Sequence, residues 1–153
     1  MKKVLILGIS GSGKTTLAKR IVEELMLTHR RETRWFNSDK MRDLFDDWDF
    51  SHEGRLRQAH RMGDHADSAM LNGRIAIVDF ICPTEEFRQA FHKAHLSDII
   101  VWMDRTQTSQ YKDTDALFEP PSYYDYRITD DDTESWVSKL VQEILTGPDT
   151  YVI

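Results

Sequence analysis

Short, fully apolar runs alternate along the chain with longer segments in which apolar residues recur every three or four positions. A short apolar run without polar alternation is typical of a strand in a parallel sheet that is covered on both faces. The helical period is clear after the first run, where Leu17, Ile21 and Leu25 recur. Strands separated by helices predict βαβ units and an α/β fold. The expected strands are Val4–Leu7, Thr33–Asn37, Ile75–Val78, Ile99–Met103 and Tyr124–Thr129, and the expected helical segments are Thr15 to about His29, Lys40–Phe45, Arg55–Leu71, Thr84 to about Ala94 and Glu134–Leu145.

The residues after the first strand carry the most specific signal. Residues 8–15 read Gly-Ile-Ser-Gly-Ser-Gly-Lys-Thr, which fits the phosphate-binding pattern G-x-x-x-x-G-K-[ST] between a strand and a helix. The glycines let the turn aim its N–H groups at an anion, and the helix amino terminus adds partial positive charge. Lys14 is expected to reach the outer phosphates of ATP, and the Thr15 hydroxyl to ligate Mg²⁺. The nucleotide-binding residues expected here are Gly8, Ser10, Gly11, Ser12, Gly13, Lys14, Thr15 and Thr16.

The motif and the alternating elements together predict the architecture. We expect a three-layer α/β fold of the P-loop NTPase and nucleotide-kinase type, with helices on both faces of a five-stranded parallel sheet in the order 2-3-1-4-5. A chain of 153 residues without repeats or linkers predicts one domain over residues 1–153. Ligands of such sheets bind beyond the carboxyl ends of the strands, so the residues that follow each strand are candidates for function.

Composition narrows the class of partner. The chain has 20 Lys and Arg against 26 Asp and Glu, a formal net charge of −6 that disfavours a general nucleic-acid binder. Its single cysteine excludes an internal disulfide. No apolar run is long enough to span a bilayer, and the three residues before the first strand leave no room for a targeting segment. We therefore expect no membrane partner and a cytoplasmic location.

A carboxylate and an arginine follow the second strand on one helical face. Asp39 and Arg42 lie three residues apart at the ligand edge of the sheet. Asp39 could orient an acceptor hydroxyl as a general base or help to hold Mg²⁺, and Arg42 could bind an anionic acceptor in a two-pronged grip. A surface ion pair, worth about 0–1 kcal/mol, explains the same two residues without a function.

The third strand ends in Asp79, followed by Phe-Ile-Cys-Pro at residues 80–83. An aspartate after an apolar strand resembles the second acidic site of P-loop enzymes, which supports Mg²⁺. An aspartate that caps the next turn would look the same. Cys82 is expected to be a small packing residue, because no histidine or aspartate pattern marks it as a nucleophile.

Two further segments combine aromatic and polar side chains. Phe50, Arg55 and Gln58 could stack on a base and bind an anion, and a charged helix start explains them almost as well. Residues 111–121 begin with Tyr111 and show no clear periodicity. A loop of that length is often a functional lid, but it can equally be plain surface.

In this order the motifs resemble those of the adenylylsulfate kinase (APS kinase) family, from about Val4 to Thr129 with one gap. The family's D-G-D-N-V-R resembles residues 37–42, its F-S/T-x-x-x-R-x-x-N-I-R-R resembles residues 50–61, its I-S-P resembles residues 81–83, and its F-T-G-I-D-D-P-Y-E-x-P resembles residues 111–121. The resemblance implies transfer of the γ-phosphoryl group of MgATP to the 3′-hydroxyl of adenosine 5′-phosphosulfate (APS), which gives PAPS. It also suggests a homodimer.

The resemblance implies roles for single residues. Phe50 and Tyr111 would bracket the adenine of the acceptor, Arg42 and Arg55 would hold its phosphosulfate, and Asp39 would meet the 3′-hydroxyl and the metal. Taken with the candidates above, the catalytic residues expected are Lys14 and Asp39, the metal-binding residues are Thr15, Asp39 and Asp79, and the acceptor-binding residues are Asp39, Arg42, Phe50, Arg55, Gln58, Ile81, Cys82 and Tyr111.

The chain departs from the family's pattern at several of these positions. Asn37 stands where the family has its first aspartate, Gln58 replaces an asparagine, and Cys82 replaces the serine of I-S-P. Asp113 and Thr114 replace the G-I pair. These changes put the identity of the acceptor in question.

The gap in the resemblance falls on the family's basic lid. This chain has only residues 104–111 in its place, with Arg105 as their one cation. A lid excludes water and adds positive charge near the transferring phosphoryl group, so its shortening affects both rate and acceptor. Two alternatives stay open: a kinase for a different small nucleotide-like or hydroxylated acceptor, and a nucleotide-binding switch with slow or no turnover.

Overall fold

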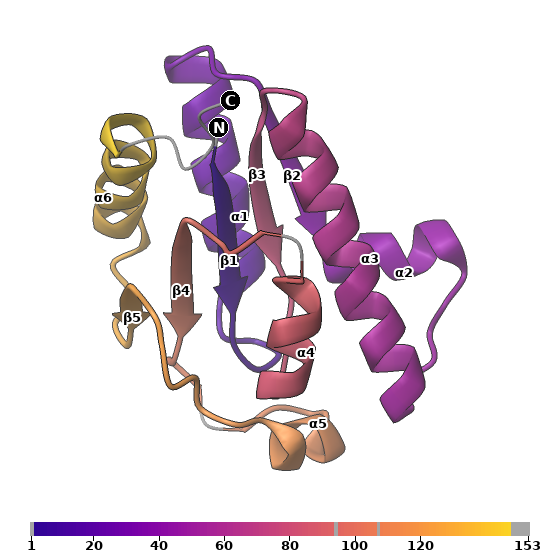
Figure 1. The fold of residues 1–153 in the computed structure, drawn as a ribbon. Helices are drawn as coiled ribbons and strands as arrows, with labels where there is room; N and C mark the ends of the chain where they lie inside the picture. The colour runs from indigo at the N-terminus through magenta and orange to yellow at the C-terminus, as the bar shows by residue number, and fades with distance from the viewer. Residues whose placement is uncertain (1, 94, 107, 148–153) are drawn as a thin grey trace.

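The computed structural model describes residues 2–93, 95–106 and 108–147 (Figure 1). Its five strands form one sheet in the order β2-β3-β1-β4-β5, as the sequence predicted, and all neighbouring strands run parallel. The strands are β1 (Lys3–Leu7), β2 (Thr33–Asn37), β3 (Ile75–Asp79), β4 (Ile99–Met103) and β5 (Tyr126–Ile128).

Helices cover both faces of this sheet, so the predicted three-layer arrangement is confirmed (Figure 1). One face carries α1 (Lys14–Glu23), its π-helical continuation η1 (Glu24–Thr28) and α6 (Thr133–Thr146). The other face carries α2 (Ser38–Phe45), α3 (His52–Leu71) and α4 (Glu85–Phe91). The short helix α5 (Lys112–Leu117) lies beyond the carboxyl ends of the strands.

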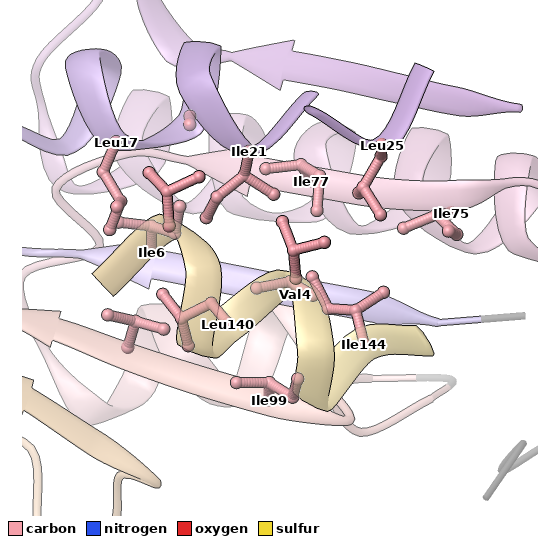
Figure 2. Packing of buried hydrophobic residues seen from close by; sticks show 14 of the residues in the cluster. Val4, Ile6, Leu17, Ile21, Leu25, Ile75, Ile77, Ile99, Leu140 and Ile144 are labelled. Atoms are coloured by element: carbon pink, nitrogen blue, oxygen red, sulfur yellow. The ribbon is translucent and has the colours of Figure 1, made fainter. Parts of the chain in front are cut away.

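The central strand β1 shows why the strands are apolar throughout. Val4 and Ile6 point into the cluster below α1 and α6, while Leu5 and Leu7 point into the cluster below α3 and α4, and all four are at most 1% exposed. Figure 2 shows the first of these clusters between the two helices. Full burial of such a side chain stabilises the fold by about 1.5–3 kcal/mol. Side chains on both faces of β1 therefore stabilise the sandwich of helices around the sheet.

Several element boundaries differ from the sequence prediction. The helices α2 and α3 begin two and three residues earlier than expected, at Ser38 and His52, and β5 is shorter than expected. The first helix changes to π-helical geometry at Glu24, and the helix expected from Thr84 to about Ala94 ends at Phe91. Ala94 itself lies outside the described residues.

Residues 112–117 form α5, where no helix was predicted. Six residues are too few to show a helical period. A local bond and a tertiary bond support this helix: the Ser109 hydroxyl donates to Asp115 Oδ1 at 2.7 Å, and Arg55 Nη2 donates to the Thr114 hydroxyl at 2.9 Å.

The carboxyl ends of the strands meet at one end of the sheet, where the arrowheads of Figure 1 point. The phosphate loop, the start of α2, residues 80–83 and α5 gather at this end. The fold therefore brings the residues that the sequence predicted to be functional to the carboxyl ends of the strands.

No helix in the described part of the chain is long and apolar enough to cross a membrane.

Candidate active site

The phosphate loop follows β1 and passes close to the end of β4. A Cβ atom on Gly8 would lie 2.5 Å from the carbonyl oxygen of Met103, which is closer than any side chain allows. Gly13, at φ +95°, is the left-handed residue that precedes α1, and its carbonyl accepts the first helical bond from the Leu17 N–H at 3.1 Å. Glycine is therefore required at both ends of the loop.

Lys14 lies in the first turn of α1 and is 8% exposed. Its Nζ donates a hydrogen bond to the carbonyl oxygen of Ile9 at 2.9 Å, across the phosphate loop. Burial lowers the pKa of Lys14 to about 8, although the carboxylates of Asp79 and Asp39 raise it. The neighbouring carboxylates thus favour the charged form that a phosphate group would bind.

Asp79, at the end of β3, is surrounded by hydrogen-bond donors. Its Oδ1 accepts from the Thr15 hydroxyl at 3.2 Å and from Asn37 Nδ2 at 3.0 Å, and its Oδ2 accepts from Trp35 Nε1 at 2.6 Å. The side chain is 2% exposed, and burial raises its pKa, while the bonds from Trp35, Thr15 and Asn37 and the charge of Lys14 oppose the rise. The strand end thus brings together two of the three predicted metal-binding residues, Thr15 and Asp79.

The oxygen atoms of Asp79 and Thr15 fit Mg²⁺. This ion prefers hard oxygen ligands, and it is usually held by one or two carboxylates together with substrate phosphates and water. Within residues 2–93, 95–106 and 108–147, no group of three or more His, Cys, Asp or Glu forms a cage of its own. Thr15 and Asp79 could supply two oxygen ligands, and a bound nucleotide and water would supply the others.

Arg42, on α2, is 4% exposed although it lines the same cavity as the phosphate loop. Its Nη1 donates to the carbonyl oxygens of Asp47 at 2.9 Å and Asp49 at 3.3 Å, and its guanidinium carbon lies 4.3 Å from the centre of the Phe50 ring. Burial lowers the pKa of Arg42. Arg42 therefore fixes the loop between α2 and α3 as well as facing the cavity.

Arg55 links α3 to α5 across the cavity. Its Nε donates to the carbonyl oxygen of Phe50 and its Nη2 to the Thr114 hydroxyl, each at 2.9 Å, and its guanidinium carbon lies 5.3 Å from the Phe50 ring centre. The pKa of Arg55 is lowered by burial and raised by Asp113. Phe50 is thus held by two arginines, with half of its surface exposed.

Gln58 connects α3 to the start of α2. Its Nε2 donates to the backbone carbonyl and the hydroxyl of Ser38, both at 3.1 Å, and its Oε1 accepts from Arg61 at 3.0 Å. The neighbouring Asp39 is exposed and lines the cavity. Gln58 therefore sets the position of the turn that carries Asp39.

Residues 80–83, which follow β3, line the same cavity. Cys82 is 1% exposed, adopts a positive φ of 45°, and its carbonyl accepts from Arg88 Nε at 3.0 Å. Burial raises the pKa of its thiol far above the ordinary value. Cys82 belongs to the apolar cluster below α3 and α4, as expected for a packing residue.

One cavity of about 1140 Å³ contains both the phosphate loop, which forms its nucleotide half, and the residues expected to bind the acceptor, which form its acceptor half. The predicted site residues that line it are Ser10, Gly11, Gly13, Lys14, Thr15, Thr16, Asp39, Arg42, Phe50, Arg55, Gln58, Asp79, Ile81, Cys82 and Tyr111. Gly8 and Ser12 are the exceptions: Gly8 packs against β4, and Ser12 is buried, its hydroxyl without a hydrogen-bond partner in the described part of the chain.

Sequence analysis missed two features of the site. Trp35 was predicted only as part of the second strand. Its place two residues before Asn37, on the same face of the strand, is the signal that could have pointed to it. The placement of the segment after β4 was also missed. Arg105 Nη1 lies 2.7 Å from where a Cβ on Gly13 would be, so the short segment that replaces the lid contacts the phosphate loop directly.

Comparison with known proteins identifies the family. The model of the adenylylsulphate kinase family matches residues 2–120. The chain belongs to this family. Residues 2–120, which match the adenylylsulphate kinase family model, include both the phosphate loop and the whole of α2 and α3.

Two known proteins illustrate the likeness in sequence and fold. The adenylyl-sulfate kinase of Bacillus licheniformis is 28% identical over 120 residues, which are 76% of this chain and 60% of the relative, so this chain spans about 60% of that relative's length. The structure of the Mycobacterium tuberculosis APS kinase in complex with AMPPNP and APS superposes with a TM-score of 0.83 at 20% identity, over 95% of this chain and 98% of that one.

A third relative is larger. A hexameric APS kinase from Thiobacillus denitrificans matches with a TM-score of 0.75 at 23% identity, over 94% of this chain and 28% of that chain. At these identities the likeness to the solved structures establishes the fold of this adenylylsulphate kinase family member.

Proposed function

We propose that the protein transfers the γ-phosphoryl group of ATP to the 3′-hydroxyl of APS. The observation that carries the proposal is the single cavity in which the phosphate loop faces an acceptor half with two arginines and the exposed rings of Phe50 and Tyr111. Membership in the adenylylsulphate kinase family supports it. So does the similar Mycobacterium tuberculosis enzyme, whose structure is a complex with AMPPNP and APS.

The phosphate loop would hold ATP by its backbone N–H groups, with Lys14 on the outer phosphates. Thr15, Asp79 and Asp39 would hold Mg²⁺, of which Thr15 and Asp79 are already joined by a hydrogen bond. When bound, the metal neutralises charge on the β- and γ-phosphates. The low exposure of Lys14 strengthens its attraction for a bound phosphate, because little water screens the charge.

Asp39 is the proposed base. The 3′-oxygen of the acceptor forms a bond to the γ-phosphorus as the bond from that phosphorus to its bridging oxygen breaks. The bridging electron pair leaves with ADP, and the hydroxyl proton passes to the Asp39 carboxylate. Because the transition state is loose, most of the catalysis would come from alignment and from charge stabilisation.

The acceptor would lie on the Phe50 side of the cavity. Its adenine would stack between Phe50 and Tyr111, which are 50% and 54% exposed, and its phosphosulfate would face Arg42 and Arg55. Phe50 would present its ring in a fixed orientation, because Arg42 and Arg55 both contact the ring and Arg55 also bonds the backbone carbonyl of Phe50. Gln58 would act by fixing the turn that carries Asp39.

The test is an acceptor panel with radiolabelled ATP, in which APS is compared with other nucleotides and with hydroxylated metabolites. We expect labelled PAPS, and we expect Asp39→Asn to lower kcat by about 10²–10⁴-fold while ATP affinity stays close to that of the native chain. Asp43→Asn is the matched control, since Asp43 is an exposed aspartate of the same helix. Labelling of another acceptor but not of APS would overturn the assignment.

A second candidate is a kinase for a less anionic acceptor, and Asp113 favours it. Asp113 lines the acceptor half and lies close enough to Arg55 to raise its pKa, so it offsets part of the charge that would bind a phosphosulfate. The same panel separates the two candidates. Tight binding of MgATP without acceptor-dependent release of ADP would favour a nucleotide-binding switch.

Self-association and location remain part of the proposal. A homodimer in the cytoplasm is the arrangement we expect, and the hexameric relative supports self-association. Sedimentation equilibrium of the purified chain measures the oligomeric state directly, with a monomer as the contrary result.

A further inference from the structure

The Asp79 carboxylate is held from both sides by residues of the neighbouring strand. Asn37 is directly opposite Asp79 in the register of β2 and β3, and Trp35 is opposite Ile77, which makes it the diagonal neighbour of Asp79 on the same face. The indole N–H of Trp35 donates to Oδ2 at 2.6 Å, and the amide of Asn37 donates to Oδ1 at 3.0 Å. The two oxygens of this carboxylate are therefore fixed by different donors.

This double attachment fixes the plane of the carboxylate relative to the phosphate loop. Oδ1 receives the bond from the Thr15 hydroxyl at 3.2 Å, and the amide of Asn37 also lies 3.3 Å from that hydroxyl. Rotation about the last bond of an aspartate is broad and roughly two-fold. The bond from Trp35 removes this freedom, because turning the carboxylate would break the shortest of its contacts.

Trp35 is well supported in this position. Its ring packs against the cluster below α1, and Lys40 Nζ lies 5.0 Å from its centre on the outer side. Trp35 is on β2, an outer strand of the sheet, where a packing role alone requires an apolar ring but no donor. The N–H group and the ring thus have separable consequences, which a substitution can distinguish.

We propose that Trp35 is a positioning residue for the metal–nucleotide site, because its indole N–H bonds one oxygen of Asp79 and so holds the carboxylate plane with the other oxygen toward Thr15. This inference rests on the proposed function, which assigns Mg²⁺ and ATP to these residues. It predicts that the N–H group contributes to the affinity gained from Mg²⁺, and that it contributes little to binding of the nucleotide without metal.

The test is calorimetric titration of the full chain with ADP, once with Mg²⁺ and once with EDTA. In the native chain Mg²⁺ strengthens ADP binding by a measurable ratio. Trp35→Phe keeps a ring and removes the donor, and it is expected to reduce this ratio by about tenfold or more, as loss of a partner of a metal-site ligand commonly does. The affinity for ADP in EDTA should remain within about twofold, because the phosphate loop is unchanged.

The matched control is Trp136→Phe. The indole of Trp136 also donates to a carboxylate, Asp130 Oδ1 at 3.1 Å, but it belongs to α6 and its partner lies outside the cavity. This variant loses the same kind of bond and should keep the native ratio. A native ratio in Trp35→Phe, or an equal loss in both variants, would overturn the inference.

A second measurement does not depend on the folding of Trp35→Phe. The indole ¹⁵N–¹H signals of the native chain can be assigned through Trp48→Phe, Trp102→Phe and Trp136→Phe, which leaves Trp35 by elimination. Addition of Mg²⁺ to the ADP-loaded chain should shift the Trp35 signal and leave that of Trp136 in place. An unmoved Trp35 signal contradicts the inference, whereas a native chain that binds no ADP contradicts the proposed function itself.

Discussion

A buried ion pair at the amino end of the strands should be essential for stability and irrelevant to the site. Lys3 Nζ is fully buried at the start of β1, where it donates to Asp67 Oδ1 on α3 at 2.7 Å and to the carbonyl oxygen of His95 at 2.7 Å. It also lies 4.4 Å from the centre of the Phe91 ring. Burial lowers the pKa of Lys3, and the bond and the charge of Asp67 are the main factors that raise it.

Removal of Asp67 would leave the buried ammonium group without its hydrogen-bonded counter-charge, and only the weaker effects of Asp98 and Asp64 would remain. Breaking one partner of such a pair costs about 3–5 kcal/mol, out of about 5–15 kcal/mol for a typical domain. Asp67→Leu should therefore lose a large part of the free energy of unfolding, measured from urea midpoints at unchanged slope. The double variant Lys3→Met/Asp67→Leu should recover most of the loss, since replacement of both charges by apolar groups is often neutral.

The control is Asp64→Asn, an exposed aspartate of the same helix whose charge affects the pKa of Lys3 less than that of Asp67, and it should change the free energy of unfolding by less than about 0.5 kcal/mol. ADP affinity should be native in all folded variants, because Lys3 lies at the amino end of β1 and the phosphate loop follows the carboxyl end of the same strand. The reasoning fails if Asp67→Leu loses less than about 1 kcal/mol, or if the double variant is no more stable than the single one.

Two further predictions concern single residues. Burial, with a smaller contribution from Lys3, lowers the pKa of His92 from 6.5 to about 4. Between these pH values the unfolded chain binds a proton at His92 that the folded chain does not, so the free energy of unfolding should fall by at most about 3 kcal/mol as the pH drops from 6.5 to 4. Urea midpoints should depend less on pH in His92→Gln. An unchanged pH dependence in this variant would contradict the prediction. Gly8→Ala should abolish ADP binding in calorimetry, because its Cβ would meet Met103 O at 2.5 Å, whereas Gly73→Ala, also at positive φ but with open space around it, should bind normally.

The sequence predicted those parts of the molecule that depend on local pattern. Residues 8–15 were recognisable because the spacing of glycines, lysine and threonine is itself the binding device. The strands were recognisable because burial on both faces removes polar residues from them. The order of the strands followed from the class of fold that the motif indicated, and it is confirmed.

Features that depend on distant partners were not predictable in the same way. Trp35 meets a carboxylate 44 positions further along the chain, and nothing in its neighbours marks that contact. Helix α5 exists because Asp115 and Thr114 are bonded to Ser109 and Arg55. Arg42 was expected as an anion-binding residue, and the backbone carbonyls that its Nη1 also holds became visible only once the loop after α2 was in place.

The partners of the buried cations distinguish the site from the rest of the interior. The charge of Lys3 is compensated by Asp67, and Arg88 has Glu85 at 3.8 Å. In the cavity, by contrast, the hydrogen bonds of Lys14, Arg42 and Arg55 go to carbonyl and hydroxyl oxygens, which are neutral. Neutral acceptors satisfy the geometry of a cation but not its charge, so desolvation favours an anion at these positions. An acidic chain of net charge −6 thus has a cavity lined by three cations that, within the described part of the chain, have no hydrogen-bonded carboxylate, and phosphate and sulfate groups are the ligands that such a cavity would bind.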